Sequence, residues 1–203
     1  ITIGIQGEWG SGKTSLLNSI KHYFSEKDEF LQIWINAWES SLLSTPEESL
    51  LKIINEIIED LLKADKSASN KDNIKKAAGK VFKGALRIGA TAALGLKAGE
   101  VTEELFEAQE NSIKALRTQL TSLVEELKTR QTNRYENVII YVDDLDRIVP
   151  KNAVAILELL KNIFSVPNCI FVLAIDYQVV VKGLEEKFGK QTAENEREFR
   201  AFF

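Results

Sequence analysis

The sequence predicts an α/β fold, a three-layer arrangement in which helices cover both faces of a parallel sheet. A first strand-like run leads into a glycine-rich loop, two later apolar runs end in aspartates, and segments of helical periodicity lie between them. Strands that alternate with helices form parallel sheets with right-handed crossovers. Ligands of such sheets bind at the carboxyl ends of the strands, where the loop and the aspartates both fall. We therefore expect the functional site at that edge.

The chain begins with a strand and a phosphate-binding loop. Residues 1–5 alternate between apolar and other side chains, and residues 7–14 read Gly-Glu-Trp-Gly-Ser-Gly-Lys-Thr. This is the pattern G-x-x-x-x-G-K-[ST], which turns backbone N–H groups toward a polyphosphate at the start of a helix. Lys13 would then meet the β- and γ-phosphates, and the Thr14 hydroxyl would bind Mg²⁺. The residues predicted to bind the nucleotide are Gly7, Glu8, Trp9, Gly10, Ser11, Gly12, Lys13, Thr14 and Ser15.

The next segments follow the same alternation. Residues 30–38 are rich in aromatic and β-branched side chains and predict a second strand. Thr45-Pro46-Glu47-Glu48 supplies a helix cap, a first-turn proline and a glutamate three residues after the cap, and apolar residues follow at helical spacing to Leu61. Residues 100–130 predict a long helix with about two heptads of leucine-rich stripe, which is short for a coiled coil. We expect that stripe to pack against the sheet of its own domain.

Residues 64–100 differ in composition from the rest. Their first half is polar and lysine-rich, and residues 84–99 are rich in alanine and glycine. The uncharged part, residues 88–96, is shorter than the roughly 20 apolar residues that a membrane span needs. We interpret the segment as an insertion packed on its own domain, with a membrane-surface or partner-binding hairpin over residues 79–101 as the alternative. The predicted division is a core of residues 1–63 and 101–203, with residues 64–100 inserted.

The apolar run 137–142 ends in Asp143-Asp144-Leu145-Asp146-Arg147. Asp143, the first residue past the strand, is placed to hold Mg²⁺, partly through water. Asp144 is placed to orient and deprotonate a water for attack on the γ-phosphate. Strand ends also carry aspartates as helix caps, so Asp146 is either a cap or a partner of the neighbouring carboxylates.

A second apolar run, residues 169–175, ends at Asp176. Asp176 either senses the γ-phosphate through water or caps the helix that follows. Arg147 is a candidate to pair with the aspartates or to reach a phosphate on a neighbouring subunit. Arg197 and Arg200 are further candidates for that arginine.

Composition narrows the class of function. A net charge of −4 and a pI near 5.3 carry no overall signature of nucleic-acid binding. The single cysteine, Cys169, predicts a buried side chain without an internal disulfide, and we expect a reducing, cytoplasmic location. Residues 70–73, Asn-Lys-Asp-Asn, lack the fourth-place acid of a guanine-reading motif, which favours ATP over GTP. The chain contains no methionine and stops at Phe203 within a predicted helix, so we expect a C-terminally truncated piece of a longer protein.

Four blocks of sequence, taken together, resemble the KAP family of P-loop NTPases. They are Gly7-Glu8-Trp9-Gly10-Ser11-Gly12-Lys13-Thr14-Ser15-Leu16-Leu17, Ile35-Asn36-Ala37-Trp38-Glu39, Val142-Asp143-Asp144-Leu145-Asp146-Arg147 and Val172-Leu173-Ala174-Ile175-Asp176-Tyr177. The resemblance implies an additional-strand (ASCE/STAND-like) P-loop NTPase fold related to AAA+ and signalling ATPases. It places the Walker B strand beside the P-loop strand and a helical insertion between Walker A and Walker B.

The resemblance also implies roles for individual residues. Lys13 and Thr14 would contact phosphate and magnesium, Asp143 would be the Walker B acid, and Asp144 would replace the usual catalytic glutamate. Members of the family often carry transmembrane segments between the two Walker motifs, whereas the insertion here is too short to span. Bacterial members are associated with phage exclusion and related antiviral defence.

We therefore predict a slow, Mg²⁺-dependent ATPase that acts as a switch. Binding of ATP would order the loops and assemble the domain into a homo-oligomer or onto an effector protein, and hydrolysis would reset it. The alternative is a nucleotide-binding scaffold, or a membrane-associated interaction module, with negligible hydrolysis.

Overall fold

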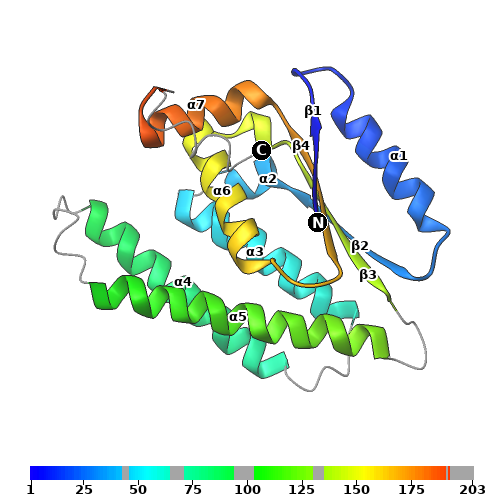
Figure 1. Ribbon diagram of the computed structural model, residues 1–203, viewed down its shortest axis with the longest axis horizontal. Coiled ribbons are helices and arrows are strands. Elements are labelled where there is room, and N and C mark those ends of the chain that lie inside the picture. The colour runs from blue at the N-terminus through cyan, green and yellow to red at the C-terminus, as the bar shows by residue number, and fades with distance from the viewer. Residues whose placement is uncertain (43–45, 65–70, 94–102, 130–134, 191, 193–203) are drawn as a thin grey trace.

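The computed structural model of the chain describes residues 1–42, 46–64, 71–93, 103–129, 135–190 and 192 (Figure 1). Its strands are β1 (Thr2–Gln6), β2 (Phe30–Asn36), β3 (Asn137–Asp143) and β4 (Cys169–Ile175). Its helices are α1 (Lys13–Ser25), α2 (Ala37–Ser41), α3 (Pro46–Ala64), α4 (Lys71–Ala93), α5 (Glu103–Thr129), α6 (Pro150–Ile163) and α7 (Tyr177–Phe188), with a 3₁₀ turn, η1 (Leu145–Arg147). The four strands are all parallel, which confirms the predicted α/β class.

The strands lie in the order β1-β4-β3-β2. Strand β4 therefore separates β1 from β3, and the expectation that the Walker B strand lies beside the P-loop strand is wrong. In the register, Ile5 of β1 pairs with Ala174 of β4, and Val172 of β4 pairs with Tyr141 of β3. The two central strands are also the most completely buried, as expected of strands covered on both faces.

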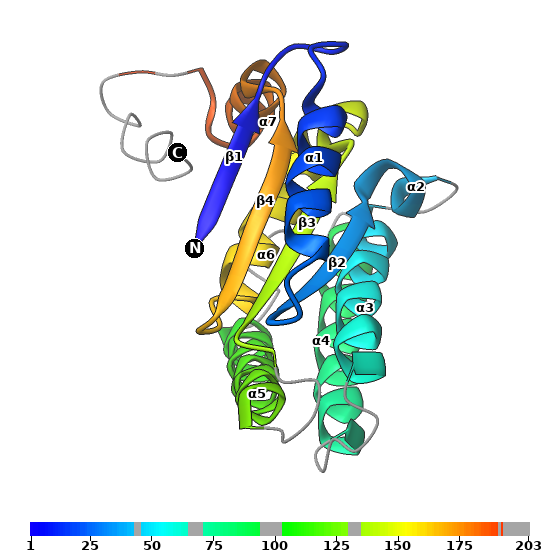
Figure 2. The ribbon, with the colours of Figure 1, turned by 90° about the vertical axis from the view of Figure 1, so that its right-hand side faces the viewer.

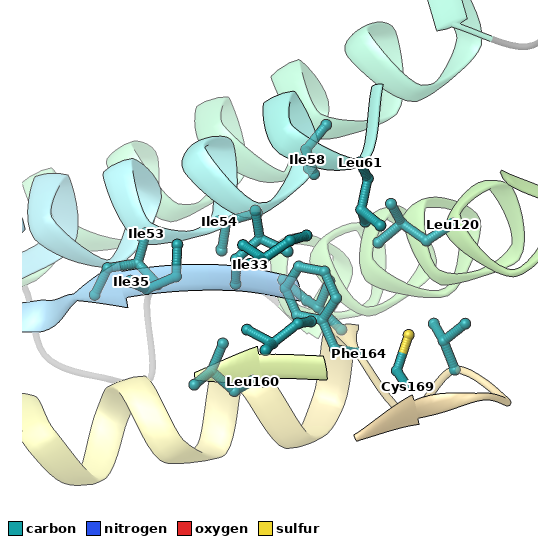
Figure 3. Packing of buried hydrophobic residues seen from close by; sticks show 14 of the residues in the cluster. Ile33, Ile35, Ile53, Ile54, Ile58, Leu61, Leu120, Leu160, Phe164 and Cys169 are labelled. Atoms are coloured by element: carbon teal, nitrogen blue, oxygen red, sulfur yellow. The ribbon is translucent and has the colours of Figure 1, made fainter. Parts of the chain in front are cut away.

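Helices cover both faces of the sheet, but unequally (Figures 1 and 2). Helix α1 lies alone on one face, whereas α3 and α6 lie on the other and the α4–α5 pair lies beyond them. The buried residues on the α1 face are Leu17, Ile139, Tyr141, Val172 and Ala174. On the opposite face, isoleucines of β2 and α3 meet side chains from α5, α6 and β4 in the larger core (Figure 3). This arrangement is the predicted three-layer fold.

Two local elements differ from the sequence-based prediction. The strand predicted over residues 30–38 ends at Asn36, because the Asn36 side chain accepts a hydrogen bond from the Glu39 backbone N–H (3.0 Å) and caps α2. Helix α4 lies within the insertion that the family resemblance implied to be helical, but its bounds were not predicted from the residue pattern. The α4 residues that are described as buried recur at steps of three and four but are partly alanines, whose small side chains give a weak periodic signal among lysines. They are Ile74, Ala77, Ala78 and Val81.

The predicted long helix is confirmed as α5. Its leucines at 116, 120, 123 and 127 are buried in the same core as β2, α3 and α6, so the stripe faces its own domain as expected. Among the helices that the structure describes, none combines the length and apolar character that crossing a bilayer requires.

Cys169 lies at the start of β4 and is 3% exposed. Burial raises the pKa of its thiol to about 12. The thiol therefore stays protonated near neutral pH and packs as a small apolar side chain, as the sequence predicted.

Helices α6 and α7 pack closely against each other at Gly183. A Cβ atom there would overlap the carbonyl group of Pro150, with its carbonyl carbon only 2.6 Å away, and would lie 2.7 Å from Val154 Cγ2. We expect Gly183→Ala to lower the free energy of unfolding by about 1–3 kcal/mol, because the helices must move apart. Urea denaturation measures this. Gly79→Ala is the matched control: Gly79 lies in α4 with open space around it, so alanine should stabilise the protein by about 0.5–1 kcal/mol.

Candidate functional site

The loop between β1 and α1 has a shape that depends on its glycines. Gly10 and Gly12 have φ angles of +83° and +90°, in the left-handed region that side chains disfavour. A Cβ atom on Gly7 would lie 3.1 Å from Ser11 Cβ and closer still to its hydroxyl. The Gly7 N–H donates to the Ile175 carbonyl (3.3 Å), which ties the loop to β4. The loop therefore curls tightly at the carboxyl edge of the sheet and runs directly into α1.

Lys13 is the first residue of α1 and is 8% exposed. Its ammonium donates hydrogen bonds to the carbonyls of Gly7 (2.8 Å) and Glu8 (3.0 Å). Its Nζ also lies 2.7 Å from Asp146 Oδ2, whose side chain is 6% exposed. This last contact is an ion pair without the alignment of a good hydrogen bond, so its attraction is mainly Coulombic. The pair joins the loop directly to the segment after β3.

At the end of β3, Asp143 is 3% exposed, and its Oδ1 accepts a hydrogen bond from the Asp144 backbone N–H (2.9 Å). Asp144 then adopts φ +59°, a left-handed conformation that aspartate tolerates better than most residues. This turn directs the chain into η1 and places the two neighbouring carboxylates in different surroundings.

Both carboxylate oxygens of Asp144 have partners. Asn36 Nδ2 donates to Oδ2 (3.0 Å), and Arg147 Nε lies 2.8 Å from Oδ1. The Arg147 guanidinium also lies over the Trp38 ring, 5.5 Å from its centroid. Of the two alternatives for Arg147, the structure therefore shows pairing with an aspartate of its own chain.

Asn36 was not among the predicted site residues. It ends β2 and lies opposite Asp143 in the sheet register. Its amide is held from both sides, because its oxygen caps α2 and its nitrogen faces Asp144. A polar residue near the end of a predicted strand is a signal of a site residue. The signal was not used, because that strand was expected to continue to Trp38.

Asp176 follows β4, between the phosphate loop and Asp143 in the strand order. Its Oδ1 accepts a hydrogen bond from the Gln178 backbone N–H (2.9 Å), and it is the N-cap of α7. The capping alternative is therefore present in the structure, and a role toward phosphate stays a prediction.

Two variants of Asp176 separate these roles. Asp176→Ala should lower the free energy of unfolding by about 1 kcal/mol, because it removes the cap. Asp176→Asn keeps an equally good cap, so its stability should match the wild type in thermal denaturation. Lower ATPase activity in a fully stable Asp176→Asn protein would indicate the phosphate-sensing role. Unchanged activity would mean that Asp176 acts only as the N-cap of α7.

The remaining predicted residues lie around the loop. Thr14 and Ser15 are exposed in the first turn of α1, and the Trp9 side chain is 76% exposed. Arg197 and Arg200 lie outside the described residues.

The protein oxygen atoms at this site suit Mg²⁺, which keeps water and phosphate ligands, better than they suit a metal ion held by protein ligands alone. Mg²⁺ usually takes one or two protein oxygens together with water and phosphate oxygens. Asp143 offers a buried carboxylate at the end of β3, and Thr14 offers an exposed hydroxyl. Over the described parts of the chain, no group of three or more acidic, histidine or cysteine side chains could hold a metal ion by itself.

A groove of about 980 Å³ has in its lining Gln6 and Ile175, the residues that directly precede the loop and Asp176. It is lined by Gly4 and Gln6 of β1 and by residues of β4, α6 and the segment after it, and none of residues 7–14 contributes. Phosphate recognition depends on converging backbone N–H groups and not on cavity size, so the loop remains the better candidate site.

The P-loop class of α/β proteins is defined by a strand, a tight glycine loop and a helix that begins with a lysine, together with a second strand that ends in aspartates. This chain has each of these parts, and its Lys13 is buried. The chain belongs to the KAP family: the model of the KAP family P-loop domain matches residues 1–203. It is also similar to the Phage T7 exclusion protein of Escherichia coli (strain K12), with 25% identity over 203 residues. That match covers 90% of this chain but only 27% of the relative.

Proposed function

We propose that this domain binds ATP with Mg²⁺ and hydrolyses ATP slowly, as a switch that controls self-assembly or an effector protein. The observation that carries the proposal is the Lys13–Asp146 contact of 2.7 Å. It joins the phosphate loop to the acid-tipped segment after β3 although β4 separates the two strands. A residue proposed to bind phosphate is therefore in contact with the segment that carries the residues proposed to handle metal and water.

Each residue of the site has a proposed role. Residues 7–15 would hold the phosphates through the backbone N–H groups that follow Gly7 and through the Lys13 ammonium. Thr14 and Asp143 would hold Mg²⁺, which supplies charge neutralisation at the β- and γ-phosphates. Asp144 would orient the attacking water and accept its proton.

Binding itself is tested by calorimetric titration of the full-length protein with ATP and with GTP, each in the presence of Mg²⁺. We expect ATP to bind at one site per chain. We expect GTP to bind at least about tenfold more weakly than ATP, because no guanine-reading motif is present. Absence of ATP binding would contradict the proposal, and preference for GTP would contradict its choice of nucleotide.

The second candidate function is a nucleotide-binding scaffold with negligible hydrolysis. It is favoured by one observation: both oxygens of Asp144 are already engaged, by Asn36 and by Arg147. A carboxylate held in this way offers an attacking water fewer free acceptor sites. Measured turnover separates the candidates, because only the switch consumes ATP.

The biological setting is a further part of the proposal. The similarity to a phage exclusion protein supports a role in bacterial antiviral defence. We expect the domain to act in the cytoplasm, where a lone cysteine stays reduced. Peripheral membrane association through residues 79–101 is the alternative; liposome co-sedimentation with and without that segment tests it.

A further inference from the structure

The η1 turn carries two charged side chains that each hold a residue of the proposed catalytic machinery. Asp146 pairs with Lys13 (2.7 Å), and Arg147 pairs with Asp144 (2.8 Å). Asp146 and Arg147 are neighbours in a turn of three residues. One short segment therefore contacts both the phosphate loop and the proposed catalytic carboxylate.

The contacts of Lys13 leave it poorly available to a ligand. An ammonium group has three N–H donors. Two of them are directed at the Gly7 and Glu8 carbonyls, and the Asp146 carboxylate lies against the same nitrogen. A polyphosphate that approaches Lys13 must compete with the Asp146 carboxylate for the space around Nζ, and it is repelled by the negative charge of Asp146.

The contacts of Asp144 restrict it in the same way. A water that approaches Oδ1 must compete with the Arg147 guanidinium, while Asn36 occupies Oδ2. Arg147 has room to move, because its side chain is 40% exposed. Asp146, by contrast, is buried and tied to the loop.

We propose that η1 is an autoinhibitory latch. In this latch, Asp146 pairs with Lys13 and Arg147 pairs with Asp144 until a nucleotide phosphate displaces Asp146 from Lys13. Asp146 and Arg147 are then positioning residues that keep Lys13 and Asp144 inactive before a nucleotide binds. The turn would move about Asp144, whose φ of +59° already departs from regular structure. The latch rests on the proposed function, since it presumes that a nucleotide binds at the loop.

The first test is the variant Asp146→Asn in the full-length protein, titrated with ADP and with ATP. We expect its dissociation constants to be about tenfold lower than those of the wild type, because the amide keeps the shape but no longer competes by charge. The matched control is Asp60→Asn, which removes a carboxylate from an exposed pair with Lys63 and should leave the constants unchanged. Unchanged or weaker binding by folded Asp146→Asn protein would overturn the latch.

The second test uses the wild-type protein and does not depend on a variant that folds. The Arg147 N–H donates to the Asp144 carbonyl (3.3 Å), so its hydrogen exchange reports on η1. With ADP bound, we expect slower exchange in residues 7–15 and faster exchange in residues 144–148. Protection of residues 7–15 with no faster exchange in residues 144–148 would overturn the latch alone. No protection of residues 7–15 by ADP or ATP would overturn the latch and the proposed function together.

Discussion

Lys13→Ala is expected to weaken ATP binding about 100-fold or more. Each charge-assisted hydrogen bond between the ammonium and a phosphate contributes roughly 1.5–3 kcal/mol, and about 1.4 kcal/mol corresponds to a factor of ten. No other lysine among the described residues is buried at the loop. Calorimetric titration with ATP and Mg²⁺ measures the loss.

The variant also affects the fold, so it needs its own controls. Without Lys13, the Asp146 carboxylate is left buried and unpaired, which costs about 3–5 kcal/mol. The double variant Lys13→Ala/Asp146→Asn should recover most of that stability but not the binding. Lys21→Ala, on the same helix and over the Trp34 ring, should bind ATP normally. Binding by a folded Lys13→Ala protein that equals the wild type would remove Lys13 from its proposed role.

The second large effect is expected at Asp144. Asp144→Asn should bind ATP within about threefold of the wild type but hydrolyse it roughly 10²–10⁴-fold more slowly, because the amide cannot accept a proton from water. Its carbonyl oxygen can still accept the hydrogen bond from Asn36, so the loop and the sheet edge should keep their structure. Phosphate release under saturating ATP and Mg²⁺ measures the turnover.

Two further variants test whether the loss of turnover is specific to Asp144. Asp28→Asn applies the same chemical change to an exposed carboxyl in the segment between α1 and β2, and its turnover should equal that of the wild type. Asp143→Asn should weaken Mg²⁺-dependent binding as well as turnover, in contrast to Asp144→Asn. Equal ATPase rates in the wild type and Asp144→Asn would mean that Asp144 is not the general base.

The fold class was predictable because local patterns determine it. Alternating strands and helices indicate a parallel sheet whatever the order of the strands. The order itself was mispredicted: apolar runs such as residues 137–142 and 169–175 show burial on both faces but not which strands are neighbours. The bounds of α4 were not predicted, because two of the four residues described as buried in it are alanines, which give a weak periodic signal.

The candidate site likewise has a part that local sequence patterns predict and a part that they do not. The phosphate loop follows from a contiguous pattern with defined glycine positions, and the Gly10 and Gly12 φ angles agree with it. The contacts from Lys13 to Asp146 and from Asn36 to Asp144 join residues more than a hundred positions apart. They depend on the order of strands and on the path of η1, which no local pattern specifies.

Single-turnover hydrolysis tests the central claim most directly. The full-length wild-type protein is mixed in excess with γ-labelled ATP and Mg²⁺, alongside Asp144→Asn, at concentrations that allow oligomers to form, since an arginine from a neighbouring subunit can complete such a site. We predict conversion of the bound ATP to ADP and phosphate by the wild type, and bound but intact ATP in Asp144→Asn. Intact ATP in both proteins would contradict the ATPase switch and leave the nucleotide-binding scaffold.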